Sequence, residues 1–375
     1  MDVTGKMLEG AGIPAGLPQM LGEMGGRELQ TALLEAYALR AGGLAVTDVL
    51  RQYETNEFTQ PSELGQREVI RFEGFAAAAI PESFNLVELP PVTALGSNSV
   101  LSNVSQRTVM ATSRNTEVVA DGVTALSLEM AKRRRQESDG SEPSHLGTFH
   151  REMRTQQHVR SGFTTHFHAL SLISAQKTTQ PDEFKASTFA EHTATYLDII
   201  DGASGQGYAT AGVDVALSNI RVMGLLTKTL GSDKELLLKN TRTPGYDAFK
   251  ELGIPLPSKI LPEDLLTVID SLPEELRVLA RPLAFMGRQF AETVARVRVE
   301  HSGAQVYFDL SRHAGMGYYQ DMAVKITATN REGRSYPLVD IGSNDWLAKL
   351  LNNKQERLVT GGMGTELFMK QFKTA

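Results

Sequence analysis

Apolar residues return every three or four positions in several segments of the chain, the spacing that predicts amphipathic helices. These segments are 28–40, 63–80, 117–135 and 184–200. Glycines at 42–43 and a proline at 81 follow the first two, and such residues end helices. Residues 230–300 also have a helical pattern, and Pro262 and Pro273 stand where the first turn of a helix accepts proline.

Shorter segments alternate apolar and polar residues, or are continuously apolar, as β-strands are. They are 84–95, 108–112, 145–152, 164–175, 214–220, 306–310, 322–329, 337–341 and 357–360. Strands joined by hairpins, with helices beside them, predict an α+β fold built on an antiparallel sheet. We expect a helical extension over residues 1–62 and one core over 63–375, with a helical insertion at about 230–300.

Composition narrows the possible functions. The 375 residues are 41% hydrophobic and 22% charged, which is typical of a globular protein with a sizeable core. A net charge of −6, with no strongly basic half, argues against tRNA or DNA, because phosphate contacts supply most of the affinity for nucleic acids. The absence of cysteine excludes disulfides and thiolate metal sites. No apolar run reaches the roughly 18 residues that span a membrane, and no signal peptide is recognisable, so we expect a cytoplasmic protein.

The most informative motifs lie in the last two thirds of the chain. MATSRNTEVVADGVTALSLEMA begins at Met110, and TFHREMRTQQHVRSGFTTHFHALSL, at 148–172, reads as a strand, a basic loop and a returning strand. VYFDLSRHAGMGYYQDMAVKI follows at 306–326, then a hairpin and DIGSNDWLAKLL, and finally TGGMGTELFMKQF.

In this order the motifs resemble those of histidyl-tRNA synthetases and their paralogues, which share the class II aminoacyl-tRNA synthetase catalytic core. The family's segments read LRPE-G-T, then F-R-x-E with F-H-Q, then FD with RG-x-x-YYTG-x-x-FE, then GGGRYDGLL and G-x-G-x-E-R-L. The matching positions are Phe149, Glu152, Phe167, His168, Phe308, Asp309, Arg312, Tyr318 and Tyr319. The resemblance covers about residues 65–375. It implies a class II antiparallel sheet flanked by helices, and a homodimer.

The departures from the family pattern concern ATP first. In class II synthetases an arginine of the second motif and one of the third hold ATP, since a guanidinium makes two-pronged contacts with phosphate. His150 and Leu367 stand at these positions, which weakens the expectation of ATP and Mg²⁺ binding. YYTG is also changed, to Tyr318–Asp321, and no anticodon-binding domain follows Ala375. The resemblance therefore argues against charging of tRNA.

The 148–172 hairpin carries half of the candidate ligand-binding residues. They are His150, Arg151, Glu152, Arg154, His166 and His168. By the two-residue alternation of strands, we expect His166 and His168 to share a face with His150 and to look into the pocket. The alternative is that they are solvated strand residues. His166 and His168 have the spacing of metal ligands, but no third ligand is evident, so we expect no metal site.

The other candidates come from the resemblance. They are Arg114, Glu117, Arg312, Tyr318, Tyr319 and Asp321. Glu117 is expected to contact the ligand because the acid of the family's LRPE lies against the substrate amine. A strand end with a satisfied salt bridge is the alternative interpretation of the group that contains Arg312 and Asp321.

Three functions remain open. The first is a synthetase-like protein that binds a small polar metabolite, an amino acid or a nucleotide, in the former aminoacyl-adenylate pocket. If it catalyses, His150 or His168 would carry the proton. The second is a non-catalytic regulatory subunit, similar to the paralogue that activates short-form ATP phosphoribosyltransferase, with that enzyme's catalytic subunit as partner. The third is an ATP-dependent amino-acid ligase acting on an acceptor other than tRNA.

Overall fold

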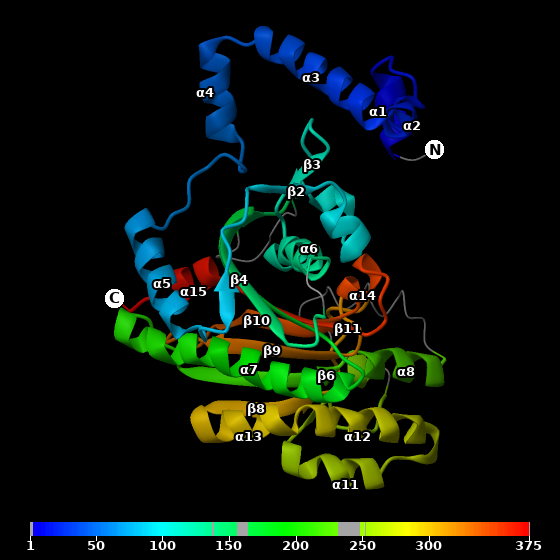
Figure 1. The fold of residues 1–375 in the computed structure, drawn as a ribbon, viewed down its shortest axis with the longest axis vertical. Coiled ribbons are helices and arrows are strands. Elements are labelled where there is room, and N and C mark those ends of the chain that lie inside the picture. The colour runs from blue at the N-terminus through cyan, green and yellow to red at the C-terminus, as the bar shows by residue number, and fades with distance from the viewer. Residues whose placement is uncertain (1–2, 137–138, 156–163, 232–247, 252, 375) are drawn as a thin grey trace.

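The molecule is built around one nine-stranded sheet (Figure 1). The structure is a computed structural model, and it describes residues 3–136, 139–155, 164–231, 248–251 and 253–374. The strand order is β1-β4-β5-β11-β10-β9-β6-β8-β7. The pairs β1/β4 and β6/β8 are parallel, and the other pairs are antiparallel. The α+β architecture is confirmed, but the sheet is mixed, because the connections from β1 to β4 and from β6 to β8 are crossovers instead of hairpins.

The strands of this sheet are β1 (Phe84–Leu86), β4 (Ser144–Met153), β5 (His166–Lys177), β6 (Gly212–Asn219), β7 (Lys259–Ile260), β8 (Ala304–Asp309), β9 (Met322–Thr329), β10 (Ser335–Asn344) and β11 (Glu356–Met363). A separate pair is formed by β2 (Val92–Ala94) and β3 (Thr116–Val118).

The α-helices are α1 (Val3–Gly10), α2 (Leu17–Glu23), α3 (Gly26–Gly42), α4 (Val46–Thr55), α5 (Gln66–Ala79), α6 (Gly122–Arg134), α7 (Pro181–Gly202), α8 (Arg221–Thr229), α10 (Ala248–Glu251), α11 (Leu265–Asp270), α12 (Ala280–Gln289), α13 (Ala291–Glu300), α14 (Trp346–Leu350) and α15 (Thr365–Phe372). No described helix is long and apolar enough to cross a membrane.

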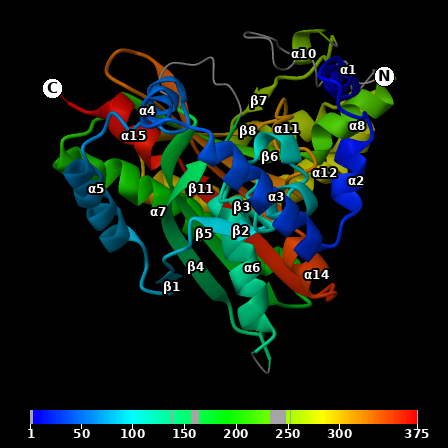
Figure 2. The same cartoon turned by 90° about the horizontal axis from the view of Figure 1, so that it is seen from above.

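Each face of the sheet is covered by its own helices (Figures 1 and 2). The long helix α7 lies on one face, where Phe189 and Tyr196 are fully buried in the larger apolar cluster. On the other face α6 and α14 form a smaller cluster around Leu126 and Trp346. Burying both faces removes most apolar side chains from water, and this provides the main stabilisation of the sheet. On the second face, a cavity lies beside α6.

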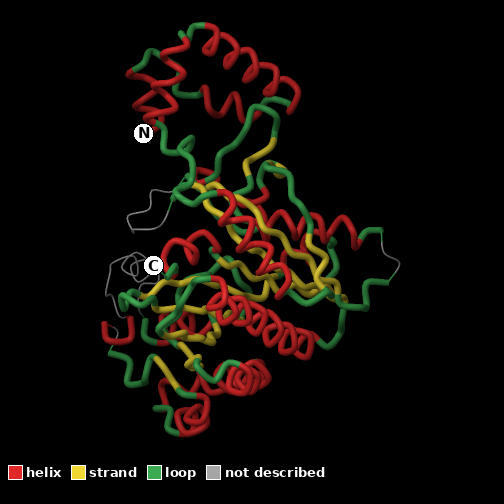
Figure 3. Tube along the Cα trace, turned by 90° about the vertical axis from the view of Figure 1, so that its left-hand side faces the viewer, coloured by secondary structure: helices red, strands yellow, loops and turns green. Residues whose placement is uncertain are grey.

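The N-terminal helices α1–α4 stand away from the sheet (Figures 1 and 3). Helix α4 lies within the predicted helical extension and has an apolar stripe at Val46, Val49, Leu50 and Tyr53, each of which is between 47% and 87% exposed. This stripe follows the i, i+3, i+4, i+7 spacing of an amphipathic helix. The extension therefore adds almost nothing to the core.

Most predicted elements are present, but two predictions near residue 115 are wrong. The helix predicted from residue 117 begins only at Gly122, where Asp121 accepts a hydrogen bond from the Val123 amide as N-cap. Its predicted first turn is instead strand β3. Residues 108–112 form no regular strand and follow a 3₁₀ turn at Gln106–Thr108. Of the predicted helical insertion, residues 232–247 and 252 lie outside the described chain.

Candidate functional site

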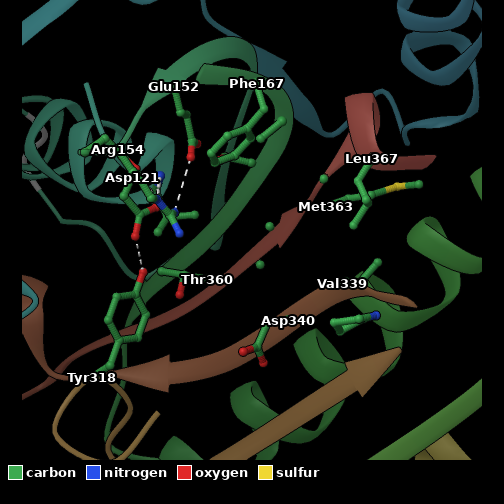
Figure 4. Close-up of a pocket in the computed structure, with 18 of the residues that line it drawn as sticks. Asp121, Glu152, Arg154, Phe167, Tyr318, Val339, Asp340, Thr360, Met363 and Leu367 are labelled. Carbon is green, nitrogen blue, oxygen red and sulfur yellow. Dashed lines mark hydrogen bonds and ion pairs between the residues drawn. The ribbon is translucent and has the colours of Figure 1, made fainter. Parts of the chain in front are cut away.

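A cavity of about 530 Å³ lies between α6 and the sheet (Figure 4). Strands β4, β5 and β9–β11, the start of α6, the start of α15 and the loop before β9 all contribute to its lining. Six charged side chains line it: Asp121, Glu152, Arg154, Lys325, Asp340 and Glu366. Carboxylates therefore outnumber cations in the lining by four to two.

The floor of the cavity is one row of residues that crosses four strands. Ser171, Gly362, Asp340 and Lys325 are successive partners across β5, β11, β10 and β9. Directly opposed residues of antiparallel strands project to the same face, so all four point toward α6. Gly362, in the middle of the row, has no side chain to fill the space above the sheet.

Asp121 is held at the N-terminus of α6 by two contacts. One carboxylate oxygen caps the helix, and the other accepts a hydrogen bond of 2.6 Å from the hydroxyl of Tyr318. The sequence here is an acid, then Gly122, then a helix, which is the arrangement of the family's LRPE-G-T. In this respect Asp121 resembles the acid of that motif more closely than Glu117 does.

Glu152 is a buried carboxyl group paired with Arg154. The Gly122 amide donates to its Oε1 at 2.7 Å, and Arg154 Nη2 donates to its Oε2 at 3.4 Å. Burial raises the pKa of Glu152 to about 7, although Arg154 opposes the shift. Arg154 also donates to the Ala120 carbonyl at 2.7 Å and stacks over Phe167. In Figure 4 this group occupies one side of the cavity, apart from Asp340.

The predicted common face of the hairpin histidines is wrong. In the observed register His150 lies opposite Ala169, whereas His168 lies opposite Arg151 and His166 opposite Met153. His166 and His168 therefore project to the face away from the cavity. His168 pairs there with Glu73 of α5 at 2.7 Å. His150 has the parity of the cavity face but does not line the cavity, and burial lowers its pKa.

Arg151 and His166 tie the segment before α5 to the sheet. Arg151 Nη1 donates to His166 Nδ1 at 2.7 Å, and a guanidinium can only donate. The proton of a neutral His166 is thus on Nε2, which donates to the Gln60 carbonyl at 2.6 Å. Arg151 also pairs with Glu366 at 3.3 Å. These bonds explain both residues as structural.

Arg114 and Glu117 do not line the cavity. Arg114 is exposed in a turn. The Glu117 carboxylate is fully buried and accepts four hydrogen bonds, from the amides of Gly96 and Asn98 and from the side chains of Asn98 and Gln106. No acceptor capacity is left for a ligand amine, so Glu117 instead holds the segment 96–106 in place.

Of the predicted group Arg312, Tyr318, Tyr319 and Asp321, only the two tyrosines line the cavity. Tyr318 and Tyr319 line the cavity, and their rings meet edge to face. Arg312 is buried just behind them and donates to Asp340 Oδ1 at 2.6 Å. Asp321 does not line the cavity. Burial works to raise its pKa, but the ammonium of Lys185 at 2.8 Å, with further hydrogen bonds, brings the pKa below its usual value.

The two positions where the family holds phosphate carry no guanidinium in the cavity. Leu367 lines it with an apolar side chain, and His150 lies outside its lining. Neither of these two positions supplies the bidentate cationic contact that a triphosphate needs, and among the described residues Arg154 is the guanidinium that lines the cavity. Within the described residues, no three side chains of the types that bind metal ions come together.

Asp121, Lys325, Asp340 and Glu366 were not among the predicted site residues. Two of them had a signal in the sequence. Asp121 precedes Gly122 and the helix as the family's acid does, and Lys325 falls where YYTG-x-x-FE ends in glutamate. Lys325 thus reverses the charge at that position.

Comparison with known proteins shows the fold. No protein-family model and no curated protein sequence matches the chain. An ATP phosphoribosyltransferase regulatory subunit/histidyl-tRNA synthetase from Bacillus halodurans has a similar structure, with a TM-score of 0.59 and 15% identity over 83% of this chain and 81% of its own.

Two further structures agree. A histidine–tRNA ligase subunit from Alicyclobacillus acidocaldarius has a TM-score of 0.57 and 12% identity over 83% of this chain and 95% of its own. Histidyl-tRNA synthetase from Nostoc has a TM-score of 0.58 and 12% identity over 84% and 74%. The chain therefore has the fold of the class II synthetase core of the histidyl type, as the motifs predicted.

Proposed function

We propose that this chain binds a small amine-bearing metabolite, with amino acids as the favoured class, in the cavity beside α6, and that it neither charges tRNA nor uses ATP. The observation that carries the proposal is Asp121. Its carboxylate lines the cavity and is bonded to a hydroxyl and an amide, and no ion pair to it occurs among the described residues. The Arg154 guanidinium lies near enough to interact with this charge but forms its ion pair with Glu152, so the Asp121 carboxylate remains an acceptor for a ligand ammonium.

The surrounding charges favour the same ligand class over a nucleotide. Among the described charged lining residues only Arg154 and Lys325 are cationic, and Arg154 is already paired with Glu152, so a triphosphate would find few free cations there. The side chain of Leu367 offers phosphate no hydrogen bond. We therefore expect ATP and Mg²⁺ to bind weakly or not at all.

Isothermal titration calorimetry against the twenty amino acids, simple alkylamines and ATP tests the proposal. We expect at least one amino acid to bind and ATP to give no heat. Asp121→Asn should lower the affinity by at least about tenfold, the equivalent of 1.4 kcal/mol. Asp270→Asn, an exposed change at the end of α11, is the matched control. Absence of heat with every amine would overturn the proposal.

Pyrophosphate exchange separates binding from ATP-dependent ligation. An adenylate-forming ligase exchanges labelled pyrophosphate into ATP when its amino acid is present. We expect no exchange with any amino acid, because the phosphate-binding arginines are replaced. Exchange above background would favour the ligase alternative instead.

A regulatory subunit is the second candidate, and one observation favours it. The Bacillus halodurans structure, whose name includes a phosphoribosyltransferase regulatory subunit, matches over 81% of its own length. The two functions are compatible, because binding a small ligand does not prevent binding of a partner subunit. Co-elution with a short-form ATP phosphoribosyltransferase catalytic subunit on gel filtration would support this role, and separate elution would count against it. The same column reports whether the chain is the homodimer that the resemblance implies.

A further inference from the structure

The charges in the cavity pair with one another except at two positions. Glu152 pairs with Arg154 at 3.4 Å, and Asp340 with Arg312 at 2.6 Å. Glu366 pairs with Lys370 at 3.0 Å and with Arg151 at 3.3 Å. Within the described residues, this leaves Asp121 and Lys325 as the charged lining residues without an ion pair.

Lys325 is unpaired although a carboxylate lies directly opposite. Asp340 is its partner across β9 and β10, but the bond from Arg312 is directed to Asp340 Oδ1. Arg312 also keeps its Nη1 buried without a hydrogen bond. Within the described residues, Lys325 thus has no ion pair of its own and Arg312 Nη1 has no hydrogen bond, so both groups have donors available to a ligand anion.

Asp121 and Lys325 belong to opposite ends of the floor. Asp121 and Gly122 lie over Ser171, since a Cβ on Gly122 would come within 2.6 Å of the Ser171 hydroxyl oxygen. Lys325 is three strands further along the same row. Three strand spacings place the Cα atoms of Ser171 and Lys325 roughly 14 Å apart. One charge is therefore over β5 and the other over β9.

Between them the floor is bare backbone. Gly362 occupies the position in the row between Ser171 and Asp340, and a Cβ added there would meet nothing within 4 Å. The chain of a ligand can cross β11 at this point without displacing a side chain. The geometry thus provides an acceptor for a cation, an open floor and a donor for an anion.

We propose that the cavity is a site for a zwitterion whose ammonium group binds Asp121 and whose anionic group binds Lys325, with the connecting chain lying over Gly362. This proposal rests on the proposed amine binding and adds the second charge and its separation from the first. Its ligand class is an amino acid with the amine and the anion at opposite ends of a short chain. An amine alone would leave Lys325 unpaired.

Calorimetric titration with matched ligand pairs tests the second charge. The ω-amino acids from glycine to 6-aminohexanoate are compared with alkylamines of the same chain length. We expect one length of ω-amino acid to bind at least about tenfold more tightly than its alkylamine, a difference of 1.4 kcal/mol. Lys325→Met should abolish that difference while the alkylamine affinity stays the same. Lys325→Gln is a second variant, and Lys132→Met, an exposed change on α6, is the control.

Gly362→Val tests the path across the floor. The side chain enters open space, so the melting temperature should be retained while binding of the preferred ω-amino acid falls at least about tenfold. Unchanged binding would overturn the placement of the ligand. If alkylamines bind but no ω-amino acid binds more tightly, the zwitterion proposal fails and amine binding stands. If no amine binds, both fail.

Discussion

The hydroxyl of Tyr318 donates a hydrogen bond of 2.6 Å to the carboxylate of Asp121, 197 residues away in the sequence. The bond joins the loop before β9 to the N-terminus of α6 at one side of the cavity (Figure 4). Burial raises the pKa of Tyr318 well above its usual value, and the Asp121 carboxylate adds to that shift. The hydroxyl therefore stays protonated and remains a donor, which fixes the orientation of Asp121.

Tyr318→Phe removes the hydrogen bond to Asp121 but keeps the aromatic ring in the cavity lining, so it should destabilise the contact between the loop before β9 and α6. Loss of a hydrogen-bond donor to a partly buried carboxylate costs about 1–3 kcal/mol of unfolding free energy. We also expect the amine affinity to fall, because Asp121 loses its fixed orientation. Urea unfolding and calorimetry measure the two effects. Tyr336→Phe, a buried tyrosine outside the cavity lining, is the matched control, and equal behaviour of the two variants would contradict the prediction.

Glu117→Gln should destabilise the protein without removing a ligand contact. The carboxylate accepts four hydrogen bonds, and an amide can accept only on its oxygen. At least one buried donor then faces an NH₂ group, at a cost of about 2–3 kcal/mol. Hydrogen exchange should increase over residues 96–106, while the affinity for the best amine changes less than threefold. A large loss of affinity at unchanged stability would show that Glu117 binds the ligand.

The sequence predicted the strands of the site better than their faces. Alternation correctly put His166 and His168 on one face of β5, because that relationship is local. Which face of β4 they join depends on the register between strands, and a shift by one residue reverses it. The register places Ala169 opposite His150, so the histidines lie on the outer face. No local pattern carries this information.

A misplaced helix start hid Asp121 for a different reason. The apolar spacing extends back into 117–119, but these residues are in β3 and the loop after it, and the helix begins at Gly122. Helix boundaries are the least reliable part of such an argument. The sequence identifies Lys325 as a charged residue on a strand. That it has no ion pair depends on Arg312, which binds Asp340 from the loop before β9. Charge pairing of this kind is a tertiary property.

Glu152→Gln should change how stability depends on pH. Burial raises the pKa of Glu152 to about 7 in the folded protein, above its ordinary value of 4.5. Between these values the unfolded chain releases the proton and the folded chain keeps it, so stability contributed by this group is lost as pH rises from about 4.5 to 7. Melting temperatures across this range should show the variant gaining on the wild type as pH rises. A constant difference would contradict the assigned pKa.

His192→Gln should make the protein less sensitive to acid. His192 is fully buried in α7 and bonded to Ser174, which also bonds His145, and burial lowers the pKa of His192 to about 3. Below pH 6.5 the unfolded chain therefore takes up a proton that the folded chain refuses, and stability falls as pH drops toward 3. At pH 5 the loss is roughly 2 kcal/mol. Gln can keep the bond to Ser174 and does not titrate, so urea unfolding at pH 7 and pH 5 should show a smaller drop for the variant. His145→Gln changes a half-buried histidine whose pKa is also lowered by burial, and it should reduce the acid-induced loss of stability less than His192→Gln does. An equal loss of unfolding free energy between pH 7 and pH 5 for the wild type and His192→Gln would refute the prediction.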